Sequence, residues 1–138
     1  MGSSIHERTA REDFSARYAR PPSDVLDGIE SRVIGGAWGA NGFTTMSQAD
    51  LIGERLRLGP DRRLLDIGTG RGWPGLYLSH RTGCEVVLAD LPIEGIHIAL
   101  DRAGRDDLPC LGGVVASARH LPFAPGSFEA IVHTDVLC

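Results

Sequence analysis

The sequence predicts an α/β fold with a doubly wound parallel sheet, and three observations predict it. Short apolar segments alternate with stretches of helical periodicity from residue 63 onward. A glycine-rich turn, LLDIGTGRGWPG at 64–75, separates a predicted strand from a predicted helix. An acid, Asp90, ends the next predicted strand. The length of 138 residues, with 42% hydrophobic and 23% charged residues, is that of one globular domain.

The charge balance excludes several classes of function. The formal net charge is −4, so neither nucleic acid nor an anionic membrane surface is an expected partner. All fourteen basic residues are arginine, which excludes a Schiff-base lysine and the lysine of a phosphate-binding P-loop within this chain.

The three cysteines indicate neither a disulfide framework nor a zinc site, because their number is odd and no C-x-x-C occurs. We expect no bound metal. No apolar run approaches the roughly 20 residues of a membrane span, and the opening residues lack the apolar core of a signal peptide. The predicted location is the cytoplasm.

Residues 1–46 are expected to precede the main domain as an arm, a helix and a cap loop. Residues 1–23 are polar and end at a Pro-Pro pair, which predicts a loosely packed arm. Asp24 is expected to cap the helix VLDGIESRVI (25–34), whose apolar residues share one face before Gly35-Gly36 end it.

The main domain is expected to span 47–138. Ser47 and Asp50 have the spacing of a capping box and predict a helix to about residue 58. Next come strands at 63–66, 85–90, 112–116 and 128–133, with helices from Pro74 to about 81 and from Pro92 to about 104. The apolar face of the last helix is predicted from Ile93, Ile96, His97 and Leu100.

The glycine turn can be read in two registers. From Gly68 it is G-x-G-x-G; from Gly70 it is G-x-G-x-x-G, the spacing of dinucleotide sites. In either register the glycines give backbone room and aim N–H groups at a ligand. Asp90, twenty residues after Gly70, suits the ribose hydroxyls of an adenosine in both cases.

Asp66 decides between the registers. A carboxylate directly before the glycines would repel a pyrophosphate, whereas an ammonium or sulfonium would be attracted to it. The first glycine after the strand is Gly68, and the sixth position counted from it is Trp73 instead of glycine. The Gly68 register is therefore favoured, and Gly75 is interpreted as close helix–strand packing.

With these residues in view, the chain resembles class I S-adenosylmethionine-dependent methyltransferases of the small-molecule type. The resemblance rests on LLDIGTGRG (64–72), VVLAD (86–90), LPF (121–123) and SFEAIVHTDVL (127–137). It covers the chain from about residue 61 onward and implies a Rossmann-like sheet with strand order 3-2-1-4. It further implies S-adenosyl-L-methionine as cofactor and a small-molecule methyl acceptor.

The resemblance also implies roles for individual residues. The methionine end of the cofactor would lie in the glycine turn, with Asp66 acting on its amino group directly or through water. Asp90 would bind the ribose. The family often has an aspartate four residues before LPF that contacts the adenine amino group, and Ser117 stands there. The implied cofactor contacts are Asp66, Gly68, Thr69, Gly70, Gly72, Asp90, Leu91, Ser117, Ala118 and His133.

His133 and Asp135 follow the last predicted strand and are the candidate catalytic residues, needed as a base only if the acceptor loses a proton of high pKa. Asp135 is equally well interpreted as the cap of a following helix. Trp38 and Phe43 in the cap loop, and Tyr18, are candidates to close over the cofactor, although core packing is the commoner role of aromatic residues.

The family continues beyond the fourth strand, so the chain is expected to be a fragment or a truncated form. Its fourth strand would then be an edge able to pair with a second copy. Two alternatives stay open beside the enzyme: a non-catalytic module that binds the cofactor, and a fragment of an NAD(P)-binding oxidoreductase.

Overall fold

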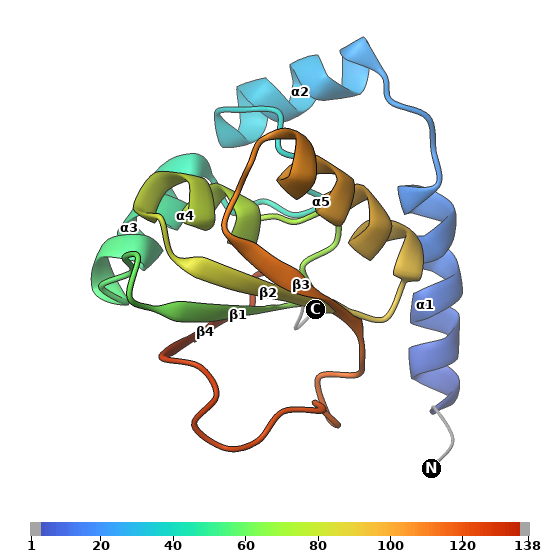
Figure 1. Ribbon diagram of the computed structural model, residues 1–138. Helices are drawn as coiled ribbons and strands as arrows, with labels where there is room; N and C mark the ends of the chain where they lie inside the picture. The colour runs from blue at the N-terminus through green and yellow to red at the C-terminus, as the bar shows by residue number, and fades with distance from the viewer. Residues whose placement is uncertain (1–3, 136–138) are drawn as a thin grey trace.

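A computed structural model describes residues 4–135 as a four-stranded parallel sheet with helices packed on it (Figure 1). In chain order the elements are α1 (Ile5–Tyr18), α2 (Asp24–Ile34), α3 (Met46–Arg55), β1 (Arg63–Ile67), α4 (Gly75–Thr82), β2 (Glu85–Asp90), α5 (Ile93–Arg105), β3 (Cys110–Val115) and β4 (Ala130–Val132).

The strand order is β3-β2-β1-β4, which confirms the predicted fold class and the predicted order 3-2-1-4. β1 lies at the centre, where Leu64 pairs with Val86 of β2 on one side and with Ala130 of β4 on the other. Because every pair is parallel, the carboxyl ends of all four strands meet at one edge of the sheet. In doubly wound folds this edge is where ligands bind.

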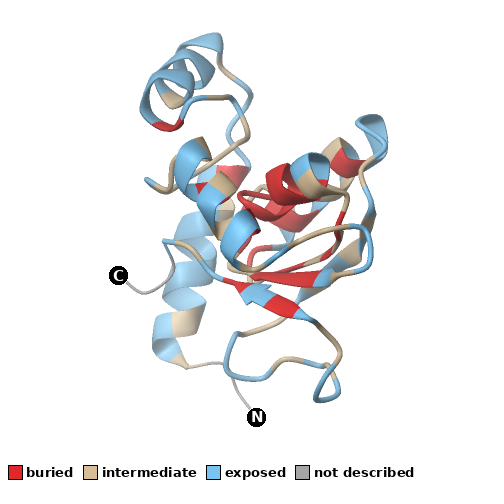
Figure 2. Ribbon diagram, turned by 90° about the vertical axis from the view of Figure 1, so that its left-hand side faces the viewer, coloured by how far each residue is buried: buried red, intermediate tan, exposed pale blue. Residues whose placement is uncertain are grey.

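The main core lies between one face of the sheet and helices α3, α4 and α5. Figure 1 shows these helices on one side and the loop from β3 to β4 on the other, and Figure 2 shows the buried residues concentrated in the strands and α4. β4 illustrates the difference between the faces: Ala130 and Val132 are buried in the core cluster, whereas Ile131 is 53% exposed.

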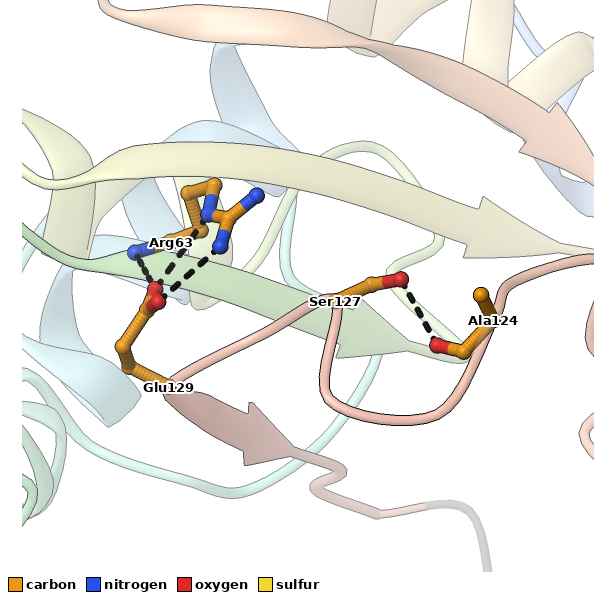
Figure 3. Close-up of polar contacts among 4 residues, drawn as sticks. All are labelled: Arg63, Ala124, Ser127 and Glu129. Atoms are coloured by element: carbon orange, nitrogen blue, oxygen red, sulfur yellow. Dashed lines mark hydrogen bonds and ion pairs between the residues drawn. The ribbon is translucent and has the colours of Figure 1, made fainter.

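An exposed ion pair fixes the start of β4 against β1 (Figure 3). The Arg63 backbone N–H and guanidinium donate to both carboxylate oxygens of Glu129, at 2.7 Å from the N–H and 3.0 Å from Nη2. These hydrogen bonds lower the pKa of Glu129 to about 2. Since both side chains are exposed, the pair contributes alignment more than stability. Ser127 Oγ closes the preceding turn by donating to the Ala124 carbonyl at 2.7 Å.

The predicted loose arm is wrong, because residues 5–18 form helix α1. Ser4 Oγ accepts from the Glu7 N–H at 3.1 Å, and Glu7 Oε2 accepts from the Ser4 N–H at 2.9 Å, a complete capping box. The helix packs against α5, and its last residue, Tyr18, is only 5% exposed. The capping box and the buried tyrosine together order a segment whose composition is mostly polar.

The starts of the next two helices differ from the predicted caps. Asp24 is the first residue of α2, and Ser23 precedes it without a side-chain cap. α3 begins two residues earlier than predicted, because Thr45 and Gln48 form the capping box in place of Ser47 and Asp50. It also ends at Arg55, before the predicted end. The apolar face of α2 is mostly exposed; within it only Ile34 is buried.

The later elements match the prediction with shifted bounds. β3 begins two residues before the predicted strand, and β4 spans only three residues. In α5 the buried residues are Gly95, Ile96, Ala99 and Ala103, while Ile93 and His97 are exposed. Ile96 belongs to the predicted face, whereas the other buried residues are glycine and alanine, because α5 packs closely on the molecule there.

Over residues 4–135, the structure contains no helix both long and apolar enough to cross a membrane.

Candidate functional site at the carboxyl edge of the sheet

The residues predicted to bind the cofactor gather at the carboxyl edge of the sheet, at the ends of the four strands. Asp66 is the penultimate residue of β1, the glycine turn follows it, and Asp90 is the last residue of β2. Ser117 follows β3 by two residues, and His133 directly follows β4. Parallel pairing therefore brings together residues that lie far apart in the sequence.

Asp66 is fully buried beneath the glycine turn. Its Oδ2 accepts from Thr69 Oγ1 at 2.7 Å and from the Gly75 N–H, at the start of α4, at 2.8 Å. Its Oδ1 has no hydrogen-bond partner within residues 4–135. Burial raises the pKa of Asp66 to about 7, against the opposing effect of those two hydrogen bonds. Asp66 thus occupies the helix N-terminus that a phosphate would need, and keeps one oxygen for another donor.

We expect Asp66→Asn to flatten the dependence of stability on pH between about pH 4 and pH 7. The folded protein holds the Asp66 proton more tightly than the unfolded chain, so the wild type loses stability as pH rises through this range. Asparagine does not titrate and removes that contribution. Urea unfolding at several pH values measures it, with Asp13→Asn, an exposed residue of α1, as the control. If the free energy of unfolding depends on pH in the same way in Asp66→Asn and in wild type, the raised pKa of Asp66 is refuted.

The glycines of the turn have no free N–H donors, which corrects the expectation that these groups point at a ligand. The N–H of Gly68 donates to the Ala89 carbonyl at 2.7 Å, that of Gly70 to Asp90 Oδ2 at 2.7 Å, and that of Gly72 to the Thr69 carbonyl at 2.9 Å. All three glycines have positive φ, where a side chain is strained. The buried Thr69 makes two of these contacts: its carbonyl accepts from the Gly72 N–H, and its hydroxyl donates to Asp66 Oδ2.

Asp90 ties β2 to the turn. In addition to the Gly70 N–H, it accepts the N–H of Leu91 on Oδ1 at 2.8 Å. Burial raises the pKa of Asp90, and the two backbone hydrogen bonds oppose this effect. A carboxylate fixed in this way keeps further lone pairs on each oxygen, so it can still accept from ribose hydroxyls.

Tyr18 lies over the turn, at the carboxyl end of α1. A Cβ atom added to Gly70 would come within 2.9 Å of the Tyr18 hydroxyl oxygen. Burial, followed by the negative charge of Asp90, raises the pKa of Tyr18 to about 12. Arg71 also joins the two segments, because its Nη2 donates to the Arg17 carbonyl at 3.0 Å. The N-terminal helix is therefore part of this edge.

The end of β3 also contacts α1. Ser117 Oγ donates to Glu7 Oε1 at 2.6 Å and accepts from the Arg119 N–H at 3.2 Å. Ala118, another of the implied cofactor contacts, is exposed next to it. Ser117 is thus already engaged by a carboxylate from the other end of the chain.

The end of β4 contacts the cap loop. Asp135 Oδ2 accepts from the Thr44 N–H at 3.2 Å and from Thr44 Oγ1 at 2.8 Å, and Asp135 itself has a positive φ of 56°. Asp135 therefore holds the cap loop at the site. His133 is exposed two residues before it. Whether either residue acts in catalysis stays a prediction.

Of the two cap-loop aromatics, Trp38 packs against the hydrophobic core. Its ring centroid lies 5.3 Å from that of Tyr77 and 6.5 Å from that of Trp73, and the Arg102 guanidinium lies over the ring at 5.4 Å from the centroid. The expectation that Trp38 closes over the cofactor is therefore replaced by core packing. Phe43 is 81% exposed and stays available to a ligand.

Sequence reasoning missed Glu7 and Thr44. The Ser4-x-x-Glu7 spacing is itself a capping-box pattern and could have revealed α1, and with it Glu7. No local pattern indicates Thr44, because its partner Asp135 lies 91 residues away in the sequence.

The fold and site together define a Rossmann-like α/β protein. Its nucleotide edge carries one buried carboxylate, Asp66, one partly buried carboxylate, Asp90, and a turn without free phosphate-binding N–H groups at its glycines. This arrangement fits a cationic cofactor better than a pyrophosphate.

Comparison with known proteins identifies a family whose cofactor is cationic. Residues 65–138 match the family described as "Methyltransferase domain". Over 79 residues the chain is 34% identical to the methyltransferase GfsG of Streptomyces halstedii, covering 56% of this chain and 28% of GfsG. It is similar to geranyl diphosphate C-methyltransferase from Streptomyces coelicolor A3(2), with a TM-score of 0.69, 18% identity and coverage of 96% of this chain and 54% of that one. It is also similar to the [4+2]-cyclase SpnF, with a TM-score of 0.65, 21% identity and coverage of 91% and 48%.

The chain belongs to the class I S-adenosylmethionine-dependent methyltransferase family. The two structural similarities support the fold. The chain spans about a quarter of the length of GfsG and about half of the two solved proteins.

Proposed function

We propose that this chain forms the cofactor-binding domain of an S-adenosylmethionine-dependent methyltransferase that acts on a small-molecule acceptor. One observation carries the proposal. Asp66 accepts a hydrogen bond from the N–H at the start of α4, and Asp90 accepts one from the N–H of Gly70. Carboxylates therefore lie where a dinucleotide site presents N–H donors to the pyrophosphate. The edge is suited to a ligand with positive charge at one end and a ribose at the other.

The residues present fit that cofactor. Asp66 Oδ1 is a buried acceptor without a partner among the described residues, as a ligand ammonium or a water bound to it would require. The glycines of the turn lie at positive φ, where a side chain would be strained, and Asp90 is fixed for the ribose. When bound, the cofactor supplies a methyl group on a sulfonium, ready for in-line displacement.

The protein's own contribution would be mainly positioning. Asp66 and Asp90 would hold the two ends of the cofactor, and Tyr18 would cover the turn between them. At the β4 end, the Asp135–Thr44 contact would hold the cap loop beside His133, leaving exposed Phe43 to contact an acceptor. His133 would accept a proton if the acceptor has one to lose. The net charge of −4 favours a small molecule over a nucleic acid as acceptor.

Calorimetric titration tests the proposal. We expect S-adenosylhomocysteine to bind the 138-residue chain at one site, and NAD to give no binding under the same conditions. Circular dichroism on the same sample establishes that it is folded. Binding of NAD but not of S-adenosylhomocysteine to folded protein would support the oxidoreductase alternative and overturn the proposal.

A further inference from the structure

The Glu7–Ser117 pair lies at the end of β3, and the function described so far leaves it without a role. The order of the strands gives it one. The glycine turn follows β1, the ribose-binding candidate Asp90 ends the adjacent β2, and β3 lies beyond β2. A nucleoside that places its ribose at Asp90 and its sulfur side at the turn must direct its base toward the end of β3.

Backbone contacts fix the end of β3 next to Asp90. Val115, the last residue of β3, pairs with Asp90, and the Ala116 N–H donates to the Asp90 carbonyl at 3.0 Å. Ser117 is the next residue. The pair is therefore adjacent to the ribose position, on the side where the base would lie.

Of the two side chains Glu7 is the stronger acceptor, because its carboxylate is charged whereas the Ser117 hydroxyl keeps only one uncharged lone pair. The only hydroxyl proton of Ser117 is donated to Glu7 Oε1, and its oxygen already accepts the Arg119 N–H. A carboxylate oxygen that receives one hydrogen bond can accept another, and it bears negative charge. The exocyclic amino group of adenine is a donor, and the oxo group of hypoxanthine at the same ring position is an acceptor.

We infer that Glu7 of α1, held by Ser117, is a specificity-determining residue that selects an amino-substituted purine by accepting its exocyclic N–H. This inference rests on the proposed function, since it assumes the nucleoside lies across the carboxyl edge. The N-terminal helix would thus supply base recognition to a site whose remaining contacts come from the sheet. The buried end of α1 at Tyr18 and its capped start at Ser4 hold Glu7 in place.

Glu7→Gln is the informative variant. Glutamine preserves the capping box with Ser4, so α1 is kept. Its amide can donate where the carboxylate only accepts, so the preference between the two bases should change, not only the strength of binding. Glu12→Gln, an exposed residue of the same helix, is the matched control.

The experiment compares the affinities of S-adenosylhomocysteine and S-inosylhomocysteine by calorimetry. For wild type and Glu12→Gln we expect the adenosyl compound to bind about 100-fold tighter, and for Glu7→Gln we expect this ratio to narrow by about tenfold. Thermal melts check that all three proteins are folded.

Two results would overturn the inference, and they are distinguishable. If wild type binds S-adenosylhomocysteine but Glu7→Gln weakens both ligands equally or leaves both unchanged, Glu7 has only a structural role and the proposed function stands. If folded wild type binds neither compound, the proposed function fails as well.

Discussion

Gly95→Ala is expected to destabilise the protein by about 2 kcal/mol, whereas Gly104→Ala in the same helix is expected to stabilise it by about 0.5 kcal/mol. A Cβ atom at Gly95 would lie 2.5 Å from the carbonyl oxygen of Gly70 and 3.0 Å from the Tyr18 ring. The first contact is with backbone, which cannot turn away, so α5 or the glycine turn must move. A Cβ atom at Gly104 meets nothing within 4 Å, so alanine there gains only its higher helix propensity.

Urea unfolding of both variants measures these changes, and calorimetry of S-adenosylhomocysteine binding measures their effect on the site. Because the displaced atom belongs to Gly70, we expect Gly95→Ala to weaken binding and Gly104→Ala to leave it unchanged. Equal stability changes in the two variants would contradict the close approach of α5 to the turn.

Asp90→Asn is expected to weaken binding of S-adenosylhomocysteine by about 10- to 100-fold. Asparagine has the same shape but only one oxygen, so its amide nitrogen must face either the Gly70 N–H or the Leu91 N–H. One backbone hydrogen bond is lost, together with the charge that would strengthen hydrogen bonds from the ribose. Asp101→Asn, an exposed residue of α5, is the control.

A 2′-deoxyribose analogue separates the ribose contact from support of the turn. The analogue should bind wild type more weakly than the parent ligand, and Asp90→Asn should reduce this difference, because the partner of the hydroxyl has gone. An unchanged difference would mean that Asp90 acts on the turn alone.

Much of the central sheet could be predicted from the sequence, because each strand there is a local pattern. The run from Arg63 to Asp66 and the segment EVVLAD are apolar enough to be buried on both faces, and glycine or proline residues bound them. The parallel arrangement then requires that Asp66 and Asp90 lie at the same edge. The family resemblance rests partly on these residues, together with LPF at 121–123 and SFEAIVHTDVL at 127–137.

The N-terminal region was predicted less well. Polar composition indicated a loose arm at residues 1–23, but α1 is ordered by one capping box and by the buried Tyr18, which lies against Gly70. Composition averages over many residues, whereas two or three specific contacts decide whether a short helix is held. The shift of the α3 cap from Ser47 to Thr45 has a similar cause, since both residues have side chains able to cap.

The sequence by itself determined the glycine turn and the acids at the strand ends, because these depend on periodicity and on residues close together in the chain. The strand order was implied by the family resemblance. Only the tertiary structure decided which groups the site leaves available. It uses the N–H groups of Gly68, Gly70 and Gly72 internally, and it brings Glu7 to Ser117 and Thr44 to Asp135 across 110 and 91 residues. Such contacts follow from how the helices pack, and no local pattern contains that information.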